Sequence, residues 1–211
     1  MPTGRLEAFS DGVLAIIITI MVLELKVPEG HDLHAFTSGV GTSLLTYLLS
    51  FVYIGIYWNN HHHMLHVTNR VTGGILWANL HLLFWLSLFP FTTAWMDESD
   101  FARTPLVVYG ANLCAAAIAY FVMQALIIRT QGADSPLRRA VGTDAKGKLS
   151  PVFYLAGIGC ALGGGDHANA WTYTGLAFFV AVAVMWLVPD RRIERSVAEV
   201  TAGAEGGNAV R

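Results

Sequence analysis

The chain has 211 residues, of which 54% are hydrophobic and only 13% are charged, and its formal net charge at pH 7 is −2. A soluble domain carries roughly 25% charged residues, so this composition excludes an ordinary soluble protein, and the weak negative charge gives no indication of nucleic-acid binding. The long apolar runs instead predict an all-α membrane protein.

Six apolar segments follow one another, and each is a candidate for the ~20-residue helix that crosses a bilayer. They are Leu6–Leu25, Thr42–Trp58, Ile75–Trp95, Leu106–Ile128, Ser150–Leu162 and Trp171–Val188. The first segment lacks a cleavable signal pattern and should remain as a helix, whereas the fifth is short and ends in glycines. We predict six transmembrane helices in one domain, 1–190, followed by a cytoplasmic tail without fixed structure, 191–211.

The first segment, RLEAFSDGVLAIIITIMVLEL, combines polar residues at its start with an apolar stripe further on. At about 100° per residue, Ile16, Ile20 and Leu23 share one stripe of a helix, which Thr19 flanks, and Asp11 points ~140° away from Ile16. The carboxylate face should therefore turn towards the second and third helices of its own subunit. The stripe must face something else, and apolar stripes of this kind usually face lipid or pack within the helix bundle.

The second segment ends in YWNNHHHMLH, which alternation of the helices places at the same membrane depth as the polar start of the first. A carboxylate at that depth needs a partner, and a histidine ring or an indole N–H can provide one. The run reads either as a polar cap at the membrane interface or as a metal site. In the second case His62 and His66 would share a helix face, and the protein would be a metal-binding transporter or sensor using His62, His63 and His66.

Basic residues predict the orientation, because cytoplasmic loops of membrane proteins carry an excess of Lys and Arg. With the N-terminus in the cytoplasm and six alternating helices, eleven basic residues fall on the inner face and two, Lys26 and Arg103, on the outer face. The eleven are Arg5, Arg70, Arg129, Arg138, Arg139, Lys146, Lys148, Arg191, Arg192, Arg195 and Arg211. We expect a multi-pass protein of the cell membrane with both termini cytoplasmic.

Enzyme chemistry finds no support in the sequence. Helical HExxH, GxSxG and P-loop patterns are absent, and His31, His34 and His167 fall on the opposite face from the histidine run, which argues against a membrane di-iron enzyme. We therefore predict no catalytic residues, no metal and no cofactor. The histidines beside Asp11 also raise the hypothesis of pH regulation, since histidine changes charge near neutral pH.

The N-terminal RLEAFSDG resembles the RxxxFSD signature of the endolysosomal potassium channel family of transmembrane proteins, in its prokaryotic single-repeat form. The matching residues are Arg5, Phe9, Ser10 and Asp11, and the similarity continues through YLLSFVYIGIYWNNHHHMLH and LFWLSLFPFTTAW. The resemblance implies a potassium-preferring cation channel that conducts passively. It further implies a homotetramer in the lipid bilayer, with helix one of each chain lining a central pore for monovalent cations.

The resemblance also assigns roles to single residues. It implies an apolar constriction, a hydrophobic gate, at Ile16, Ile20 and Leu23, and a selectivity layer at Thr19. It implies a structural and gating network behind the pore, formed by Arg5, Phe9, Ser10, Asp11, Trp58, Asn59, His61 and His62. The carbonyl filter TVGYG is absent, so K⁺ selectivity should be modest and a narrow apolar ring could gate by dewetting. Glu24 could form an acidic ring at the outer mouth or have a structural role.

Overall fold

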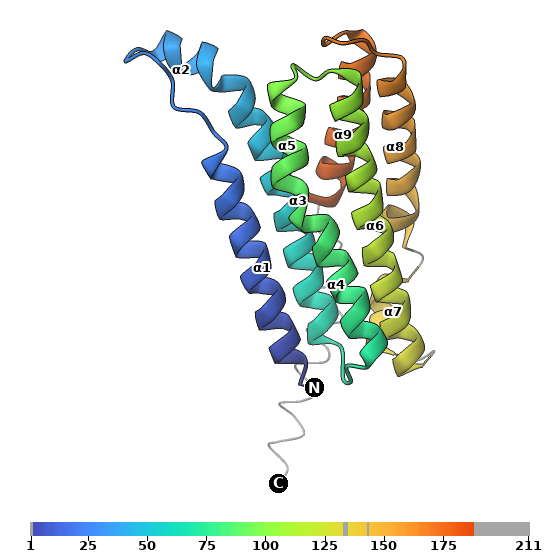
Figure 1. The fold of residues 1–211 in the computed structure, drawn as a ribbon. Helices are drawn as coiled ribbons and strands as arrows, with labels where there is room; N and C mark the ends of the chain where they lie inside the picture. The colour runs from blue at the N-terminus through green and yellow to red at the C-terminus, as the bar shows by residue number, and fades with distance from the viewer. Residues whose placement is uncertain (1, 133–134, 143, 188–211) are drawn as a thin grey trace.

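The computed structural model describes residues 2–132, 135–142 and 144–187, and the regular structure in these ranges is helical (Figure 1). The elements are α1 (Thr3–Leu23), α2 (Leu33–Gly39), α3 (Gly41–His66), α4 (Gly73–Ser87), α5 (Phe89–Glu98), α6 (Arg103–Gln131), α7 (Pro136–Val141), α8 (Ala145–Leu162) and α9 (Ala170–Leu187). The all-α class is confirmed. The predicted tail, 191–211, lies outside the described residues.

Five helical stretches in the described ranges are long and apolar enough to cross a membrane. They are Thr3–Leu23, Gly41–His66, Gly73–Glu98, Arg103–Gln131 and Ala170–Leu187. The remaining predicted segment, Ser150–Leu162, forms most of α8, whose first residues include two lysines. Since α8 runs alongside α6 and α9 (Figure 1), it is the candidate for the sixth span, which stays a prediction.

The third predicted segment, Ile75–Trp95, forms two helices rather than one. α4 ends at Ser87 and α5 begins at Phe89, with Pro90 in the first turn of α5. Proline has no backbone N–H, and its ring collides with the carbonyl four residues earlier, so an uninterrupted helix cannot pass through it. The helix resumes directly after the break, because the backbone N–H and the hydroxyl of Thr92 both donate to the Leu88 carbonyl oxygen, at 2.9 and 3.0 Å.

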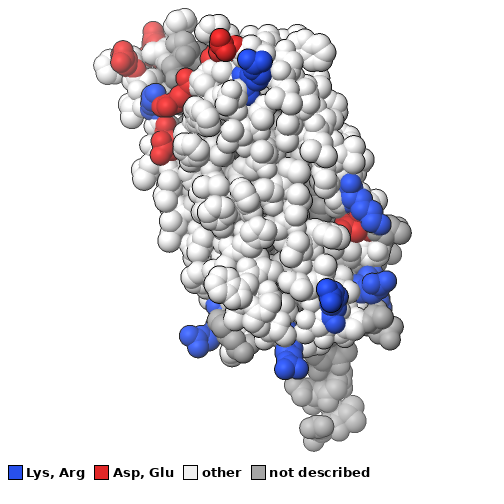
Figure 2. Space-filling model, turned by 45° about the vertical axis from the view of Figure 1, so that its right-hand side comes forward, with Lys and Arg blue, Asp and Glu red and all other residues white. Residues whose placement is uncertain are grey.

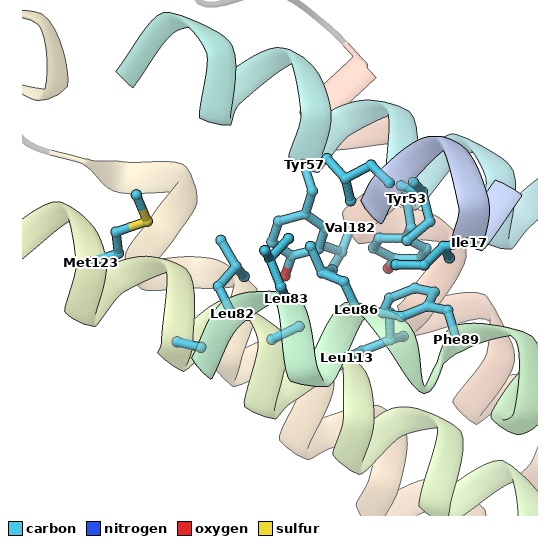
Figure 3. Close-up of a cluster of buried hydrophobic side chains, with 14 of the residues drawn as sticks. Ile17, Tyr53, Tyr57, Leu82, Leu83, Leu86, Phe89, Leu113, Met123 and Val182 are labelled. Atoms are coloured by element: carbon cyan, nitrogen blue, oxygen red, sulfur yellow. The ribbon is translucent and has the colours of Figure 1, made fainter. Parts of the chain in front are cut away.

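The core of the bundle is a continuous cluster of buried apolar and aromatic side chains from several helices. Figure 3 shows Ile17 of α1, Tyr53 of α3 and Phe89 of α5 gathered with residues of α4, α6 and α9. The Tyr53 hydroxyl donates to the Phe179 carbonyl oxygen at 2.6 Å, so its polar end is satisfied inside the core. Because lipid is as apolar as these side chains, close packing and internal hydrogen bonds must hold the helices together.

Glycines bring α8 and α9 into backbone contact. A Cβ atom placed on Gly175 would lie 2.7 Å from the Gly157 carbonyl oxygen, which is closer than real Cβ contacts allow. Small residues at such crossings let transmembrane helices approach closely. The pairing of α8 with α9 therefore depends on these two positions.

Charged side chains separate along the long axis of the molecule. In Figure 2 the acidic residues lie mostly at the end that carries α2 and the basic residues mostly towards the opposite end, where α1 begins, with an acidic side chain also visible among the basic ones. The described basic residues at that opposite end lie at the start of α1, after α3, at the end of α6, in α7 and at the start of α8. This is the asymmetry that the sequence predicts for an inner and an outer face.

Candidate functional site

Helix α1 lies at one edge of the bundle and presents two different faces (Figure 1). Its buried residues recur at helical spacing and point towards α3, α4 and α5. They are Leu6, Ser10, Leu14, Ile17 and Met21. Such an i, i+4, i+7 pattern places one stripe of a helix against its neighbours and leaves the other side uncovered.

The four residues predicted to line a pore lie on the uncovered side of α1. The side chains of Ile16, Ile20 and Leu23 are 59%, 43% and 79% exposed in the single chain. Thr19 is also exposed, and its hydroxyl donates to the Ile16 carbonyl oxygen at 2.9 Å. This bond uses the hydroxyl proton and leaves the oxygen as an acceptor on the same face.

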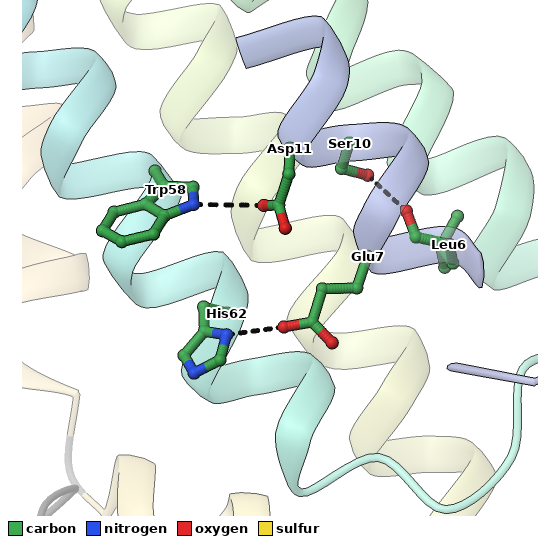
Figure 4. Close-up of polar contacts among 6 residues, drawn as sticks. All are labelled: Leu6, Glu7, Ser10, Asp11, Trp58 and His62. Atoms are coloured by element: carbon green, nitrogen blue, oxygen red, sulfur yellow. Dashed lines mark hydrogen bonds and ion pairs between the residues drawn. The ribbon is translucent and has the colours of Figure 1, made fainter. Parts of the chain in front are cut away.

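Two contacts join the start of α1 to the end of α3, and Figure 4 shows them one above the other. Trp58 Nε1 donates to Asp11 Oδ1 at 3.1 Å. His62 Nδ1 lies 2.5 Å from Glu7 Oε1. Residues four apart share a helix face, so Glu7 and Asp11 of α1 face His62 and Trp58 of α3. We call these four residues the carboxylate clamp, with the Asp11–Trp58 contact as its upper rung and the Glu7–His62 contact as its lower rung. The partner of Asp11 is thus an indole rather than a histidine.

A second polar connection is buried behind the carboxylate clamp and passes through Asn79 of α4. Asn79 Nδ2 donates to Ser10 Oγ at 3.0 Å, and Ser10 Oγ donates to the Leu6 carbonyl oxygen at 2.9 Å. Asn79 Oδ1 lies 2.7 Å from His61 Nε2. With the amide oxygen accepting, His61 must carry a proton on Nε2. The Ser10–Asn79–His61 network therefore links α1, α4 and α3.

Sequence reasoning missed Asn79, although a signal was present. It is an amide in the mostly apolar stretch ILWANLHLLFWL, and buried polar groups in a membrane need partners. Ser10 and Asn79 are fully buried and His61 is 2% exposed. Among the described residues, His61 Nδ1 has no hydrogen-bond partner. That unprotonated nitrogen is an acceptor inside the bundle.

Three residues of the predicted network stand apart from these contacts. Arg5, Phe9 and Asn59 are exposed on the surface of the chain. Within the described ranges, none of their side chains joins the carboxylate clamp or the buried network through Asn79. A role for these three residues in the network stays a prediction, because the contacts within the single chain do not include them.

The histidine run does not form a metal site in the described part of the chain, where no three His, Cys, Asp or Glu side chains are placed to hold an ion. The rings of His62 and His66 are stacked, with centroids 6.1 Å apart, and His62 Nδ1 faces Glu7. The metal-binding alternative therefore finds no support in the geometry.

The C-terminal end of α1 continues into a loop that an ion pair holds against α5. Lys26 Nζ lies 2.8 Å from Glu98 Oε1, and the hydrogen bond and charge of Glu98 raise the pKa of Lys26. Glu24 is exposed beside this pair and lines an open groove between α1 and α5 together with Ile16, Ile20 and Trp95. The apolar stripe of α1 is thus continuous with a groove on the same side of the bundle.

Comparison with known proteins places this architecture in a family. Residues 5–90 match the family model described as endosomal/lysosomal potassium channel TMEM175. A Chryseobacterium protein named as a potassium channel is 50% identical over 199 residues, which cover 94% of this chain and all of that relative. A Streptomyces collinus protein with the same kind of name is 32% identical over 171 residues, 75% of this chain and 82% of the relative.

A solved structure has the same fold. The crystal structure of a lysosomal potassium-selective channel TMEM175 homolog from Chamaesiphon minutus aligns with a TM-score of 0.71 at 28% identity, covering 88% of this chain and 96% of that one. The sequence match to the Chryseobacterium relative extends over nearly the whole chain, well beyond the residues that carry the signature. The chain therefore belongs to the family of the endosomal/lysosomal potassium channel TMEM175.

Proposed function

We propose that the protein is a potassium-preferring cation channel in which four chains surround a pore lined by α1. One observation carries the proposal: Ile16, Ile20 and Leu23 form an exposed apolar stripe on α1, in a chain whose relatives are named as potassium channels. A family of channels also supports a passive conductor rather than an enzyme. K⁺ is then the transported ion and not a cofactor.

The position of α1 favours assembly around it. The helix lies at the edge of its own bundle (Figure 1), and the groove beside it is lined on the α5 side by Phe91 and Trp95, both exposed. Neighbouring copies packed around a central axis would cover these aromatic rings and leave the stripe facing the axis. Closed symmetric rings are the usual form of such head-to-tail contacts, and the resemblance to the single-repeat form of the family implies four copies.

In such a ring the stripe would act as a constriction. A narrow ring of isoleucine and leucine side chains cannot replace the water around an ion, so it penalises hydrated ions and can close by dewetting. The Thr19 hydroxyl oxygens would form one layer of acceptors between Ile16 and Ile20. Since K⁺ loses its water more cheaply than Na⁺, this arrangement supports a modest preference for K⁺.

The carboxylate clamp and the Asn79 network would hold α1 in place behind the constriction. They contact the face of α1 that carries Glu7, Ser10 and Asp11, and the stripe occupies another face. In this proposal, the residues of the carboxylate clamp and of the Asn79 network set the angle of α1 and do not contact the ions. Any movement of α3 relative to α1 would change that angle, which gives the network a gating role.

The charge separation supports the orientation that we propose in the cell membrane, with the N-terminus and the predicted tail in the cytoplasm. The end bearing Arg5, Arg70 and Arg129 would face inwards, and the acidic end beside α2 would face outwards (Figure 2). With α8 as the sixth span, both chain ends come to the same side. The acidic outer end would concentrate cations at the mouth.

Flux through liposomes tests the channel. Purified wild-type protein should carry K⁺ in preference to Na⁺, and Ile16→Asn or Ile20→Asn should raise the flux because a polar ring stays hydrated. The matched control is Ile118→Asn on α6, where the isoleucine is equally exposed but far from α1 in the fold. Absence of flux in wild type and pore variants alike, or an equal increase with Ile118→Asn, would remove the basis for this pore.

A further inference from the structure

A cavity separate from the pore face lies between α3, α6, α8 and α9. Its volume is about 50 Å³, and it is lined by Tyr57, Tyr120, Gln124, Asp144, Ser150 and Trp186 among others. These residues lie towards the basic end of the bundle, at the end of α3, late in α6, around the start of α8 and at the end of α9. Neither the carboxylate clamp nor the stripe of α1 contributes to it.

Hydrogen-bond donors in the cavity wall are directed at oxygens of the protein itself. The contacts are Trp186 Nε1 to Ser150 Oγ at 2.8 Å, Ser150 Oγ to the Lys146 carbonyl at 2.8 Å, Tyr120 Oη to the Asn60 carbonyl at 3.3 Å, Asn60 Nδ2 to the Ile56 carbonyl at 2.8 Å and Gln124 Nε2 to Asp144 Oδ2 at 3.4 Å. With these protons used, the wall offers chiefly oxygen lone pairs and aromatic faces, beside the Tyr57 hydroxyl and the second amide protons of Asn60 and Gln124. Such a surface favours a ligand that donates or carries positive charge, and disfavours an anion.

The aromatic rings and one carboxylate supply the matching electrostatics. Tyr57 and Tyr120 meet edge to face with ring centroids 6.0 Å apart, and the negative faces of such rings attract cations. The Lys146 ammonium already stands 6.0 Å from the centre of the Trp186 ring, which shows that this wall accepts an ammonium group. Asp144 adds a single negative charge, and its Oδ1 accepts from the Gly147 backbone N–H at 3.0 Å.

The volume of the cavity and the charges in its wall limit the kind of ligand that it can bind. A cavity of 50 Å³ is about a third of the ~150 Å³ that holds benzene, and exceeds the ~10–15 Å³ that one water needs. The wall holds one carboxylate, Asp144, and the Lys146 ammonium stands beside the same wall. Oxygen lone pairs and ring faces therefore supply most of the attraction, and they limit the ligand to a single positive charge. We propose that this cavity binds a small monovalent cation, either an alkali ion such as K⁺ or an amine no larger than methylammonium, at a site within each chain and away from the pore.

Equilibrium dialysis of the full-length protein in detergent with radiolabelled methylammonium tests the site, with N-methylglucamine chloride keeping the ionic strength constant. Wild type should bind one ion per chain in a saturable manner, whereas a site on the axis of a tetramer would bind one per four chains. KCl that displaces the label assigns the site to alkali ions, and label that KCl leaves in place assigns it to amines. Wild type without saturable binding would contradict the proposal.

Two variants separate the site from the fold. Asp144→Asn keeps the bond from Gly147 and tolerates the left-handed backbone at φ 45°. It removes the charge and replaces Oδ2, which accepts from Gln124 at 3.4 Å, by an NH2 group, and we expect binding at least about tenfold weaker. Ala117→Leu should fill the cavity and abolish binding. Ala111→Leu, an exposed position on the same helix, should bind like wild type. Unchanged binding in Asp144→Asn or Ala117→Leu overturns the proposal.

Discussion

His61 Nε2 and Asn79 Oδ1 lie 2.7 Å apart inside the helix bundle, and this contact ties α3 to α4 directly behind α1. Asn79 also donates to Ser10 of α1, so one amide satisfies partners on two other helices. In a medium without water, an amide whose oxygen and NH2 group are both hydrogen-bonded stabilises the packing of the helices. Without the amide, its buried partners would lack hydrogen bonds and would destabilise the same packing.

Replacing Asn79 should therefore be costly. Asn79→Leu keeps the heavy-atom shape of the side chain but leaves the His61 N–H and the Ser10 hydroxyl oxygen without their amide partner. We expect the free energy of unfolding to fall by about 2 kcal/mol. Denaturant unfolding in detergent, followed by circular dichroism, measures it. Asn59→Leu on the exposed face of α3 is the control and should change stability by less than about 0.5 kcal/mol. Equal effects of the two substitutions would count against the network.

The upper rung of the carboxylate clamp can be measured by a double-mutant cycle. Trp58→Phe removes the indole N–H, and Asp11→Ala removes its acceptor. A hydrogen bond to a charged group is worth ~1.5–3 kcal/mol, and partial exposure of this pair places the expected coupling near the lower limit. Trp77→Phe, at an exposed position of α4, should show no coupling to Asp11→Ala. Additive effects of Trp58→Phe and Asp11→Ala would show that the contact contributes nothing.

The lower rung joins two titratable side chains, His62 and Glu7, that are 48% and 23% exposed. Histidine changes charge between about pH 5 and 8, so protonation would convert this contact into a full ion pair between α1 and α3. We expect K⁺ flux in liposomes to depend on pH over this range. His62→Gln should flatten that dependence and His66→Gln should preserve it. A wild-type flux that is flat over the range would exclude this mechanism.

The crossing of α8 and α9 should not tolerate a methyl group. Gly175→Ala would place Cβ against the Gly157 carbonyl, and overpacking of this kind costs ~1–3 kcal/mol. Thermal unfolding in detergent should show a lower midpoint for this variant. Gly159→Ala, also in α8, meets nothing within 4 Å and should be neutral or slightly stabilising. A neutral Gly175→Ala would mean that the helices do not approach so closely.

The Lys26–Glu98 pair predicts a dependence of stability on alkaline pH. The pKa of Lys26 is raised in the folded protein, so the pair stabilises at pH values below the ordinary lysine pKa of ~10.4, and its contribution is lost as the pH rises through the raised value. The melting temperature of wild type should exceed that of Lys26→Gln at pH 8, and the difference should shrink above about pH 10.5. Lys26→Arg should keep it, since arginine stays charged; a difference that is constant with pH in wild type would argue against the pair.

The amino-acid sequence by itself determined the membrane class, the helical structure and the two faces of α1. Composition and apolar run lengths are local properties, and the bilayer allows few ways to satisfy the backbone of such segments. Alternation of the helices across the membrane also placed the start of the first helix, with Asp11, at the same depth as the end of the second, with Trp58 and His62. The sequence did not determine which residue meets which, and it predicted one continuous helix where α4 ends at Ser87 and α5 begins at Phe89.

Only the tertiary structure decided the partners. The rotation of each helix about its axis results from packing with all its neighbours, and a shift of one residue turns a side chain by about 100°. That rotation pairs Asp11 with Trp58 and Glu7 with His62, and it buries Asn79 between Ser10 and His61. It also brings Tyr120, Asp144 and Trp186, far apart in the chain, around one cavity.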